Sequence, residues 1–513
     1  MRYCKLFFNN TSVYILFLIL LFIIIGTINI LHHEMWRDET QALMIIDNSS
    51  SLSELFNNTR FEWTPQLWYW LIYCIRKATN NTIAIKIFNL IIATAAVYVF
   101  IKFAPFNKFQ KLLFIFGYYP LYEYGTISRP YILSILFIFI FCALIRSGEK
   151  NYFFISCILF LLCQVNLISI GITIILAITL FVDFFLSDTG SKKKILNYKK
   201  TQLSIGLIIF IIGLIVVFSC MVPFLPILLD FKCSYSIEQQ NSLKPFYHSI
   251  ISIYRSYVPI PEIKIDFWNT NIIISTTIQL VLSLMLFGLS IIALIKNPVP
   301  LFLYTFGTLV MIFSFWRLYP VYYLRIEGYL FVLFIICFWI SNYNKANSPR
   351  IPLPTSRLIF TRKIKNIFLT IILVIHFLVG IGSSIIDWLY PFSAGKKVAE
   401  FIKNKNIDNY LIAGDWDFAA STVSFYINKD IYYPRSDKFG SYIIWDKKRL
   451  DRKQKNDINI YQELKRLVKK ERKNLLLVMN YELDTTKIPI KKIREFTKSM
   501  VEDEKYFLYI INK

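Results

Sequence analysis

Residues 13–31 read VYILFLILLFIIIGTINIL, and this stretch decides the fold class. A helix needs about 20 mainly apolar residues to cross the hydrocarbon core of a bilayer, and this run has that length without a charged residue. It ends without a small-residue cleavage site, which favours a retained first helix over a signal peptide. Similar apolar runs recur at 82–101, 131–146, 151–166, 167–186, 203–226, 271–295, 299–316, 326–341 and 366–388. The sequence therefore predicts a polytopic α-helical membrane protein with about 11–13 transmembrane helices.

The composition of the 513 residues agrees with this class. Hydrophobic residues make up 56% and aromatic residues 17% of the chain, and the mean hydropathy is +0.49, which excludes an ordinary soluble protein. The formal net charge of +24 comes mostly from short loops and the C-terminal part, as expected for contacts with anionic lipid headgroups, and predicts no nucleic-acid partner. The eight cysteines show no CxxC or Cys/His metal spacing, so neither a disulfide framework nor a zinc site is predicted.

The basic residues predict how the chain is threaded. Arg2 and Lys5 precede the first apolar run, which places the N-terminus in the cytoplasm by the positive-inside rule. The first outer loop is then 32–65, which is rich in acidic residues, and a short span beginning at Pro65 returns the chain to the inside at Arg76. Later basic loops fall inside in the same scheme.

One stretch does not fit this scheme. Lys102, Lys108 and Lys111 follow the run 82–101, which should emerge outside, and the next apolar run is too short for an ordinary span. The crossings become consistent if residues 108–122 form a half-helix or a re-entrant segment, a shape that is tolerated where protein or a cavity covers it. An odd number of full crossings then places the C-terminus outside the cytoplasm.

The hydropathy falls beyond residue 391. Short β-rich runs such as NYLIAG (409–414) and KYFLYII (505–511) alternate there with amphipathic helical patterns such as IYQELKRLVKKERK (460–473). The sequence therefore predicts two domains, a transmembrane domain at 1–391 and a small soluble extracytoplasmic α/β domain at 392–513.

Four outward-facing segments concentrate ionisable residues at the edge of the membrane. They are WRDETQ (36–41), FEWTPQLWYW (61–70), YYPLYEYGTISRPYIL (118–133) and FWRLYPVYYLRIEGYL (315–330). Unpaired burial of such side chains costs several kcal/mol, so those that face a shared cavity are functional candidates. The candidates are Arg37, Asp38, Glu39, Glu62, Glu123, Arg129, Arg317, Arg325 and Glu327.

Simpler structural interpretations of these segments stay open. Asp38 and Glu39 fit a solvated loop with Arg37 as a surface ion partner, and Arg129 fits an interfacial anchor before a proline. His32 and His33 next to Glu34 do not have a zinc-ligand spacing, so we interpret them as polar caps of the first helix. The paired carboxylates of DWDF (415–418) fit a strand-to-helix turn with an Asp cap.

The candidates fit the transfer of a sugar from a polyprenyl phosphate. The phosphate is a competent leaving group that needs no general acid, but its charge must be held by Arg or Lys. The incoming hydroxyl needs a carboxylate to accept its proton, typically worth roughly 10²–10⁴-fold in rate. Direct displacement by the acceptor would invert the anomeric centre.

The order of these segments resembles the GT-C superfamily of integral-membrane glycosyltransferases, which includes protein O-mannosyltransferases and lipid A aminoarabinose transferases. The resemblance covers the whole chain and is strongest over 31–135 and 315–330, with a bacterial subgroup that carries a WRDE signature. It implies that Asp38 is the catalytic base with Glu39 beside it, and that Glu62 matches the acidic residue before the proline of the second helix. Two positions differ from the family pattern, because Thr64 and Ile326 stand where histidine is common.

The resemblance implies an inverting glycosyltransferase of the cell membrane. Its partners would be membrane lipids, a polyprenyl-phosphate-linked monosaccharide donor and an extracytoplasmic acceptor, which is a cell-surface glycan, lipid or protein. Arg37, Glu62, Glu123, Arg129, Arg317 and Arg325 would bind substrate, and no metal ligand is predicted. Some superfamily members use a divalent cation and others do not, so the metal requirement stays open. A lipid-linked saccharide transporter or flippase and a polysaccharide polymerase are the alternative functions, although the chain shows no internal repeat typical of a transporter.

Overall fold

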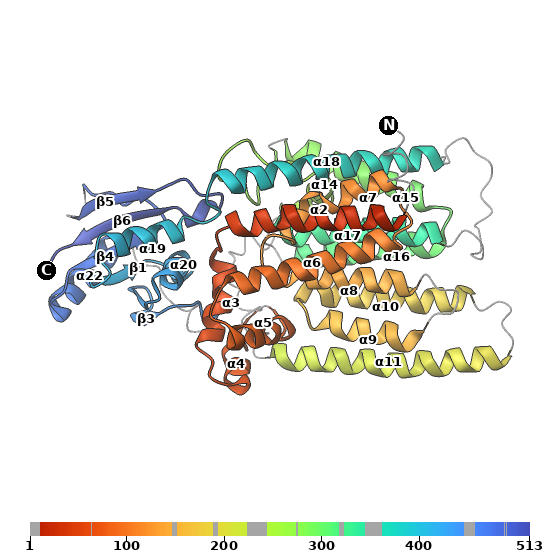
Figure 1. Ribbon diagram of the computed structural model, residues 1–513, viewed down its shortest axis with the longest axis horizontal. Helices are drawn as coiled ribbons and strands as arrows, with labels where there is room; N and C mark the ends of the chain where they lie inside the picture. The colour runs from red at the N-terminus through yellow and green to blue at the C-terminus, as the bar shows by residue number, and fades with distance from the viewer. Residues whose placement is uncertain are drawn as a thin grey trace.

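The computed structural model describes residues 11–62, 64–145, 151–187, 193–222, 244–272, 275–317, 323–343, 362–445, 457–486, 488 and 490–513. Helices run side by side along the long axis of the molecule, and a smaller domain with the strands lies at one end (Figure 1). In the described part, eight helices are long and apolar enough to cross a membrane: α2 (Thr11–His32), α6 (Ile83–Phe103), α10 (Leu167–Ser187), α11 (Lys193–Met221), α15 (Thr276–Leu294), α16 (Pro298–Arg317), α17 (Leu324–Tyr343) and α18 (Arg362–Leu389). The chain is therefore a polytopic helical membrane protein.

Shorter helices complete the transmembrane domain. Two of them are apolar, α8 (Tyr131–Leu144) and α9 (Tyr152–Cys163). The others are α3 (Arg37–Asp47), α4 (Leu52–Asn58), α5 (Leu67–Ala78), α7 (Lys108–Ile115), a π-helical turn (Tyr118–Glu123) and α14 (Lys244–Tyr257). Capping residues fix several helix starts: Ser51 accepts a hydrogen bond from Glu54 N at α4, and Asn107 accepts one from Gln110 N at α7.

The predicted span beginning at Pro65 is absent among the described residues. The segment forms α5, which has only 12 residues and lies beside α3. Arg76 near the end of α5 pairs with Asp47 at the end of α3, with Nε 2.7 Å from Oδ1. Arg76 thus stays at the end of the bundle that carries the C-terminal domain, and the prediction that it lies on the opposite side is wrong.

Helix α6 carries the chain away from the C-terminal domain instead. Lys86 near its start donates hydrogen bonds to the carbonyls of Ile30 and His33 at the end of α2, at 3.0 and 2.5 Å. Its other end lies next to the start of α7, where Lys111 Nζ donates to the carbonyl of Ile101 at 2.6 Å. The lysines that follow α6 therefore lie at the end opposite the C-terminal domain, and the irregularity in the charge pattern disappears.

Residues 108–129 form a broken helical segment that runs from one end of the bundle to the other. The predicted short helix at 108–122 is present as α7, but the prediction that this segment turns back is wrong. At the far end, Tyr14 Oη at the start of α2 donates to the carbonyl of Lys108 at 2.6 Å. At the domain end, Asn29 Nδ2 near the end of α2 donates to Thr126 Oγ1 at 3.1 Å. Pro120 lacks a backbone donor and lies within the π-helical turn, which accounts for the break.

Helix α14 is an element that the sequence does not predict. It ends at Tyr257, which is fully buried in the bundle, and residues 258–272 then lead back to the domain end. There the ring of Trp268 lies 4.7 Å from the ring of Trp36, measured between centroids. Phe267 and Trp268 of this segment are buried, whereas Ile263 and Lys264 are exposed, so protein covers only part of the return segment.

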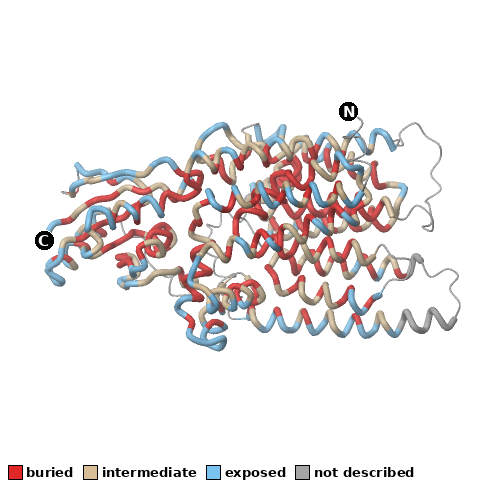
Figure 2. The backbone as a smooth tube through the Cα atoms, in the orientation of Figure 1, coloured by how far each residue is buried: buried red, intermediate tan, exposed pale blue. Residues whose placement is uncertain are grey.

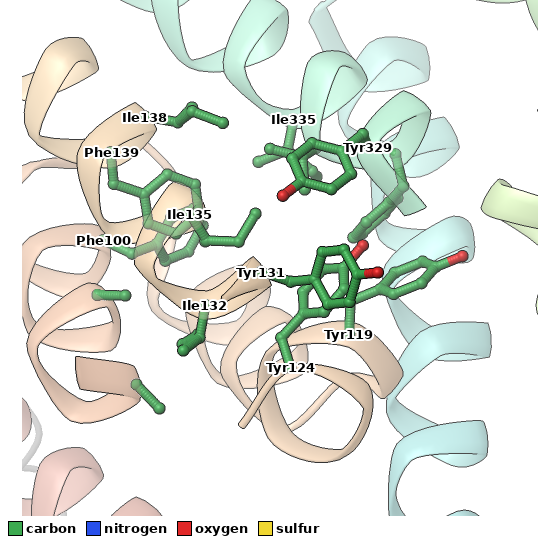
Figure 3. Packing of buried hydrophobic residues seen from close by; sticks show 14 of the residues in the cluster. Phe100, Tyr119, Tyr124, Tyr131, Ile132, Ile135, Ile138, Phe139, Tyr329 and Ile335 are labelled. Atoms are coloured by element: carbon green, nitrogen blue, oxygen red, sulfur yellow. The ribbon is translucent and has the colours of Figure 1, made fainter. Parts of the chain in front are cut away.

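The core of the bundle surrounds α17. Nearly every side chain from Leu324 to Ser341 is buried, and the tube is red along this helix (Figure 2). Tyrosine and phenylalanine rings from several helices fill the space beside it (Figure 3). A Cβ at Gly328 would lie 2.3 Å from Tyr119 Cε1, so this close approach requires glycine.

The C-terminal domain contains one six-stranded sheet with the order β3-β2-β1-β4-β6-β5. Its strands are β1 (Leu411–Gly414), β2 (Ile431–Tyr433), β3 (Lys438–Gly440), β4 (Leu475–Met479), β5 (Lys491–Phe496) and β6 (Tyr506–Ile511). β1 pairs in parallel with β2 and β4, and the other pairs are antiparallel. Helices α19 (Gly395–Asn404) and α20 (Asp417–Ile427) cover one face, and α22 (Asp457–Glu471) covers the other. The predicted small α/β domain thus has three layers.

Candidate functional site

The WRDETQ segment forms the start of α3, directly after the end of α2. Helix α3 packs against α20, so the segment lies between the transmembrane helices and the C-terminal domain (Figure 1). Asp38 and Glu39 stand in the first turn, where the backbone N–H groups of a helix favour negative charge. The exposed fraction of the Asp38 side chain is 24%, whereas the Glu39 side chain is buried. Asp38 is therefore the carboxylate that a ligand can reach.

Three arginines surround the Asp38 carboxylate. Arg325 Nη2 lies 3.1 Å and Arg129 Nη2 lies 3.7 Å from Asp38 Oδ2, and Arg37 Nε lies 3.9 Å from Oδ1. Arg129 also donates a hydrogen bond through Nη1 to the backbone carbonyl of Asp38. The structure thus brings together residues from three separate candidate segments.

The guanidinium groups of this cluster are incompletely satisfied. Arg325 Nε and Nη1 and Arg129 Nε are buried atoms that have no hydrogen-bond partner among the described residues. Asp38 is the carboxylate that lies within ion-pair distance of both Arg129 and Arg325, so the two guanidinium groups share one acceptor at this distance. Buried unpaired donors are costly, and a phosphate group is the type of anion that would satisfy them in a bidentate way.

The pKa values of two nearby carboxyls, Asp38 and Glu62, shift in opposite directions. Burial raises the pKa of Asp38, but the guanidinium groups of Arg129, Arg325 and Arg37 lower it. The net effect is a pKa below the ordinary value of an aspartate. Burial raises the pKa of Glu62 above its ordinary value, although hydrogen bonds oppose this shift. Asp38 therefore stays ionised over a wide pH range, whereas Glu62 is the more basic carboxylate.

Glu62 is held close to the domain boundary by two side chains. It accepts hydrogen bonds from Gln41 Nε2 at 2.9 Å and from Tyr69 Oη at 3.1 Å. Gln41 in turn exchanges two hydrogen bonds with the backbone of Ile443, at 2.7 and 2.9 Å. A glutamine of the first outer loop thus links Glu62 to the C-terminal domain.

Glu39 is part of a buried ionic triad. His33 lies between two carboxylates, with Nε2 3.0 Å from Glu39 Oε2 and Nδ1 2.9 Å from Asp387 Oδ2 in α18. The other oxygen of Glu39 accepts the backbone N–H of Ser128 at 2.7 Å. Because its oxygens are occupied by buried partners, Glu39 fits a residue that positions the loop.

Aromatic rings enclose Arg325. Its guanidinium carbon lies 5.1 Å from the ring centre of Trp36, 5.3 Å from that of Trp268 and 4.3 Å from that of Tyr323. Trp268 is fixed by Glu123, whose Oε2 accepts a hydrogen bond from the indole nitrogen at 3.1 Å. Glu123 therefore contacts the cluster through Trp268, and the rings favour a planar guanidinium at position 325.

Arg37 joins the cluster to the C-terminal domain. Its Nη1 lies 2.5 Å from Asp503 Oδ2, and its backbone N–H donates to Glu504 Oε1 at 2.8 Å. Its guanidinium carbon also lies 5.3 Å from the ring centre of Trp36 and 5.4 Å from that of Phe418 in α20. A residue of the first outer loop is thus fixed by the last part of the chain.

Two candidates lie outside the cluster. Glu327 pairs with Arg255 of α14, with Oε2 2.8 Å from Nε, and accepts a hydrogen bond from Ser252 at 3.1 Å. Arg317 is exposed at the end of α16, where its guanidinium lies 4.1 Å from the ring centre of Trp316. Glu327 therefore belongs to the attachment of α14 to α17.

Several residues of the site are missed by the sequence analysis. His33 was interpreted as a helix cap, and Asp387, Trp268 and Asp503 were not singled out. The charge of Asp387 inside an otherwise apolar run, IGSSIIDWLY (381–390), is the one signal that points to a buried partner. Trp268 and Asp503 lie in stretches with no distinctive pattern.

The described residues contain no group of three or more His, Cys, Asp or Glu side chains placed to hold a metal ion. The donor set around Asp38 is dominated by guanidinium groups, which repel a cation and fit an anion. No protein-family model, no curated protein and no solved structure matches this chain.

Proposed function

We propose that this protein is a GT-C-type inverting glycosyltransferase that moves a monosaccharide from a polyprenyl phosphate to an acceptor on the side of the C-terminal domain. The observation that carries the proposal is the pairing of Asp38 with Arg129 and Arg325, whose remaining guanidinium nitrogens are buried without a hydrogen-bond partner in the part of the chain that the structure describes. One carboxylate and an excess of arginine at the end of a transmembrane bundle fit a reaction that needs a base and a site for a phosphate leaving group.

The proposed roles follow from the chemistry of each group. Arg129 and Arg325 bind the donor phosphate, and Asp38 accepts the proton of the acceptor hydroxyl. The bond between the anomeric carbon and the phosphate oxygen breaks, and polyprenyl phosphate leaves with the electron pair. The acceptor oxygen forms the new bond on the opposite face of the sugar, which inverts the anomeric centre.

Donor binding would also activate the base. In the absence of donor the arginines hold the pKa of Asp38 low, against the effect of burial, and a carboxylate of low pKa is a weak base. A donor phosphate bound to Arg129 and Arg325 competes for their charge and weakens their attraction for Asp38. The pKa of Asp38 then rises when the donor is in place, which couples proton abstraction to donor binding.

The topology supports an acceptor on the outer side. Among the described residues, eleven crossings result if α8, α9 and the broken segment 108–129 each cross the membrane together with the eight long helices. With this odd number, a cytoplasmic N-terminus would put the Asp38 cluster and the C-terminal domain outside the cytoplasm. The lysines after α6 and the basic loop near residue 365 then lie inside, in agreement with the positive-inside rule.

The test measures cleavage of the donor. The purified chain in proteoliposomes is given polyprenyl-phosphate monosaccharides with radiolabelled sugars, together with a cell-envelope extract as the source of acceptor. A transferase releases polyprenyl phosphate and labels an acceptor, and Asp38→Asn abolishes both. A flippase moves the intact labelled donor across the membrane without cleaving the sugar–phosphate bond, and that result would replace the proposal.

A further inference from the structure

Aromatic rings and guanidinium groups alternate across the boundary between the two domains. Arg37 lies between the rings of Trp36 and Phe418, at 5.3 and 5.4 Å. The ring of Phe418 lies 5.9 Å from that of Trp416, and the guanidinium carbon of Arg435 lies 4.3 Å from the Trp416 ring centre. We call the residues on the C-terminal domain, Trp416, Phe418 and Arg435, the aromatic strip.

Both rings of the strip remain partly accessible. Trp416 and Phe418 are intermediate in exposure, so the domain boundary does not cover them completely. One face of each ring is occupied by a guanidinium group. The exposed part of each ring therefore offers apolar surface to a ligand.

The strip lies where the sheet favours ligand binding. Trp416 follows β1 and opens α20, and Arg435 follows β2, so both lie beyond the carboxyl ends of neighbouring parallel strands. Ligands of open α/β sheets bind at this edge. The edge faces the proposed active site, because Phe418 contacts Arg37, the neighbour of Asp38.

The charges beside the strip are already balanced. Arg37 is paired with Asp503, and Arg435 makes two contacts with Asp415, at 2.5 and 2.8 Å. The Arg435–Asp415 pair is buried and holds Arg435 against the Trp416 ring, whereas 41% of the Asp503 side chain is exposed. The pair of Arg37 with Asp503 therefore offers a donor and an acceptor side by side without a net charge. Hydroxyl groups both donate and accept hydrogen bonds, so such a pair matches the rim of a sugar ring, while the aromatic rings match its apolar face.

We propose that the aromatic strip binds a neutral saccharide unit of the acceptor and presents its hydroxyl to Asp38. This inference rests on the transferase function proposed above and names the class of acceptor for it. It also explains why the C-terminal domain is attached to the first outer loop through Arg37 and Gln41. The saccharide is held by the soluble domain, and the donor is held by the membrane domain.

Saccharide binding can be measured without donor and therefore independently of transfer. The full-length chain in detergent is applied to an array of defined neutral and acidic tetrasaccharides, and bound protein is quantified. Trp416→Ala and Phe418→Ala remove the stacking surface, and Trp416→Phe retains an aromatic ring. Phe439→Ala is the matched control, because Phe439 is an aromatic residue of the same domain that is 49% exposed on β3.

The wild-type chain is expected to bind at least one neutral tetrasaccharide, with affinity reduced about tenfold in each alanine variant and retained in Trp416→Phe and Phe439→Ala. Equal binding by Trp416→Ala, Phe418→Ala and Phe439→Ala overturns the proposal. Binding of acidic glycans alone, or of none, also overturns it. The donor-cleavage assay decides the transferase function separately, so a failure of either proposal can be told from a failure of the other.

Discussion

His33 Nδ1 lies 2.9 Å from Oδ2 of Asp387, a residue 354 positions later in the chain. The same imidazole contacts Glu39 through its other nitrogen, so one buried side chain links the end of α2, the start of α3 and the end of α18. Two carboxylates around one imidazole favour the imidazolium form. The position of Asp38, one residue before Glu39, therefore depends on a proton held by His33.

This proton predicts a pH-dependent stability. Burial lowers the pKa of His33, but the attraction of Asp387 and Glu39 raises it. The pKa in the folded chain is raised to about 9. Because the pKa in the unfolded chain is about 6.5, the contribution is complete below that pH and is lost as the pH rises to 9. We expect the thermal midpoint of the purified chain to fall across this window, with a loss of at most about 3 kcal/mol. His33→Gln should make the thermal midpoint nearly independent of pH in this window. His32→Gln, at the exposed neighbouring position, should leave the pH dependence unchanged.

Replacing Asp38 tests the proposed base. Asp38→Asn keeps the size of the side chain but removes the proton acceptor, so transfer should fall by roughly 10²-fold or more. Donor binding, measured by retention of the labelled donor, should change little or become tighter, because the arginines lose a competing carboxylate. Asp47→Asn at the far end of the same helix is the matched control and should transfer at the wild-type rate. Turnover of Asp38→Asn within a few-fold of wild type would remove Asp38 from the reaction.

The arginines test the site for the donor phosphate. Arg325→Lys and Arg129→Lys keep the positive charge but lose the planar fork, so donor affinity should fall by about tenfold. Arg325→Lys also loses stacking against Trp36 and Trp268, so it should be the more damaging change. Arg76→Lys, in a pair with Asp47 away from the cluster, serves as the comparison. Unchanged donor affinity in both cluster variants would exclude these residues from the donor site.

Labelling of introduced cysteines tests the path of the chain. Lys77 and Lys108 are exposed, and the structure places them at opposite ends of the bundle. In a cysteine-free background, Lys77→Cys should react with a membrane-impermeant reagent added outside intact cells, whereas Lys108→Cys should react only after permeabilisation. A reporter fused after Lys513 that is active only in the cytoplasm should stay silent. Labelling of both cysteines from the same side would contradict the role of α6 as the return crossing.

The class of the protein and the composition of the cluster are predictable from the sequence because both depend on local patterns. Long apolar runs identify the transmembrane helices, and the alternation of short β-rich and amphipathic stretches identifies the C-terminal domain. Asp38, Arg129 and Arg325 come from segments that the charge distribution assigns to one side of the membrane, and the structure places them within ion-pair distance. Their catalytic roles stay predictions.

The rest depends on contacts that no local pattern records. The segment after Pro65 is as apolar as a short span, yet α5 is held against α3 by the pair of Arg76 with Asp47. Helix α14 and the return segment that carries Trp268 are stabilised by α17 and by the interior of the bundle. Asp387, one partner of His33, and Asp503, one partner of Arg37, lie more than 350 residues away in the chain. The neighbouring sequence therefore does not reveal the buried triad or the attachment of the C-terminal domain.

The attachment of Arg37 to Asp503 has a consequence for biosynthesis. The two residues are separated by 466 positions, so the first outer loop leaves the ribosome long before its partner is made. Arg325 and Asp387, which contact Asp38 and His33, are also made long after this loop. We therefore expect a nascent or C-terminally shortened chain to lack the contacts that hold Arg37 at the domain boundary. If the proposed function is correct, the donor site around Asp38 is completed only after the C-terminal domain has been made.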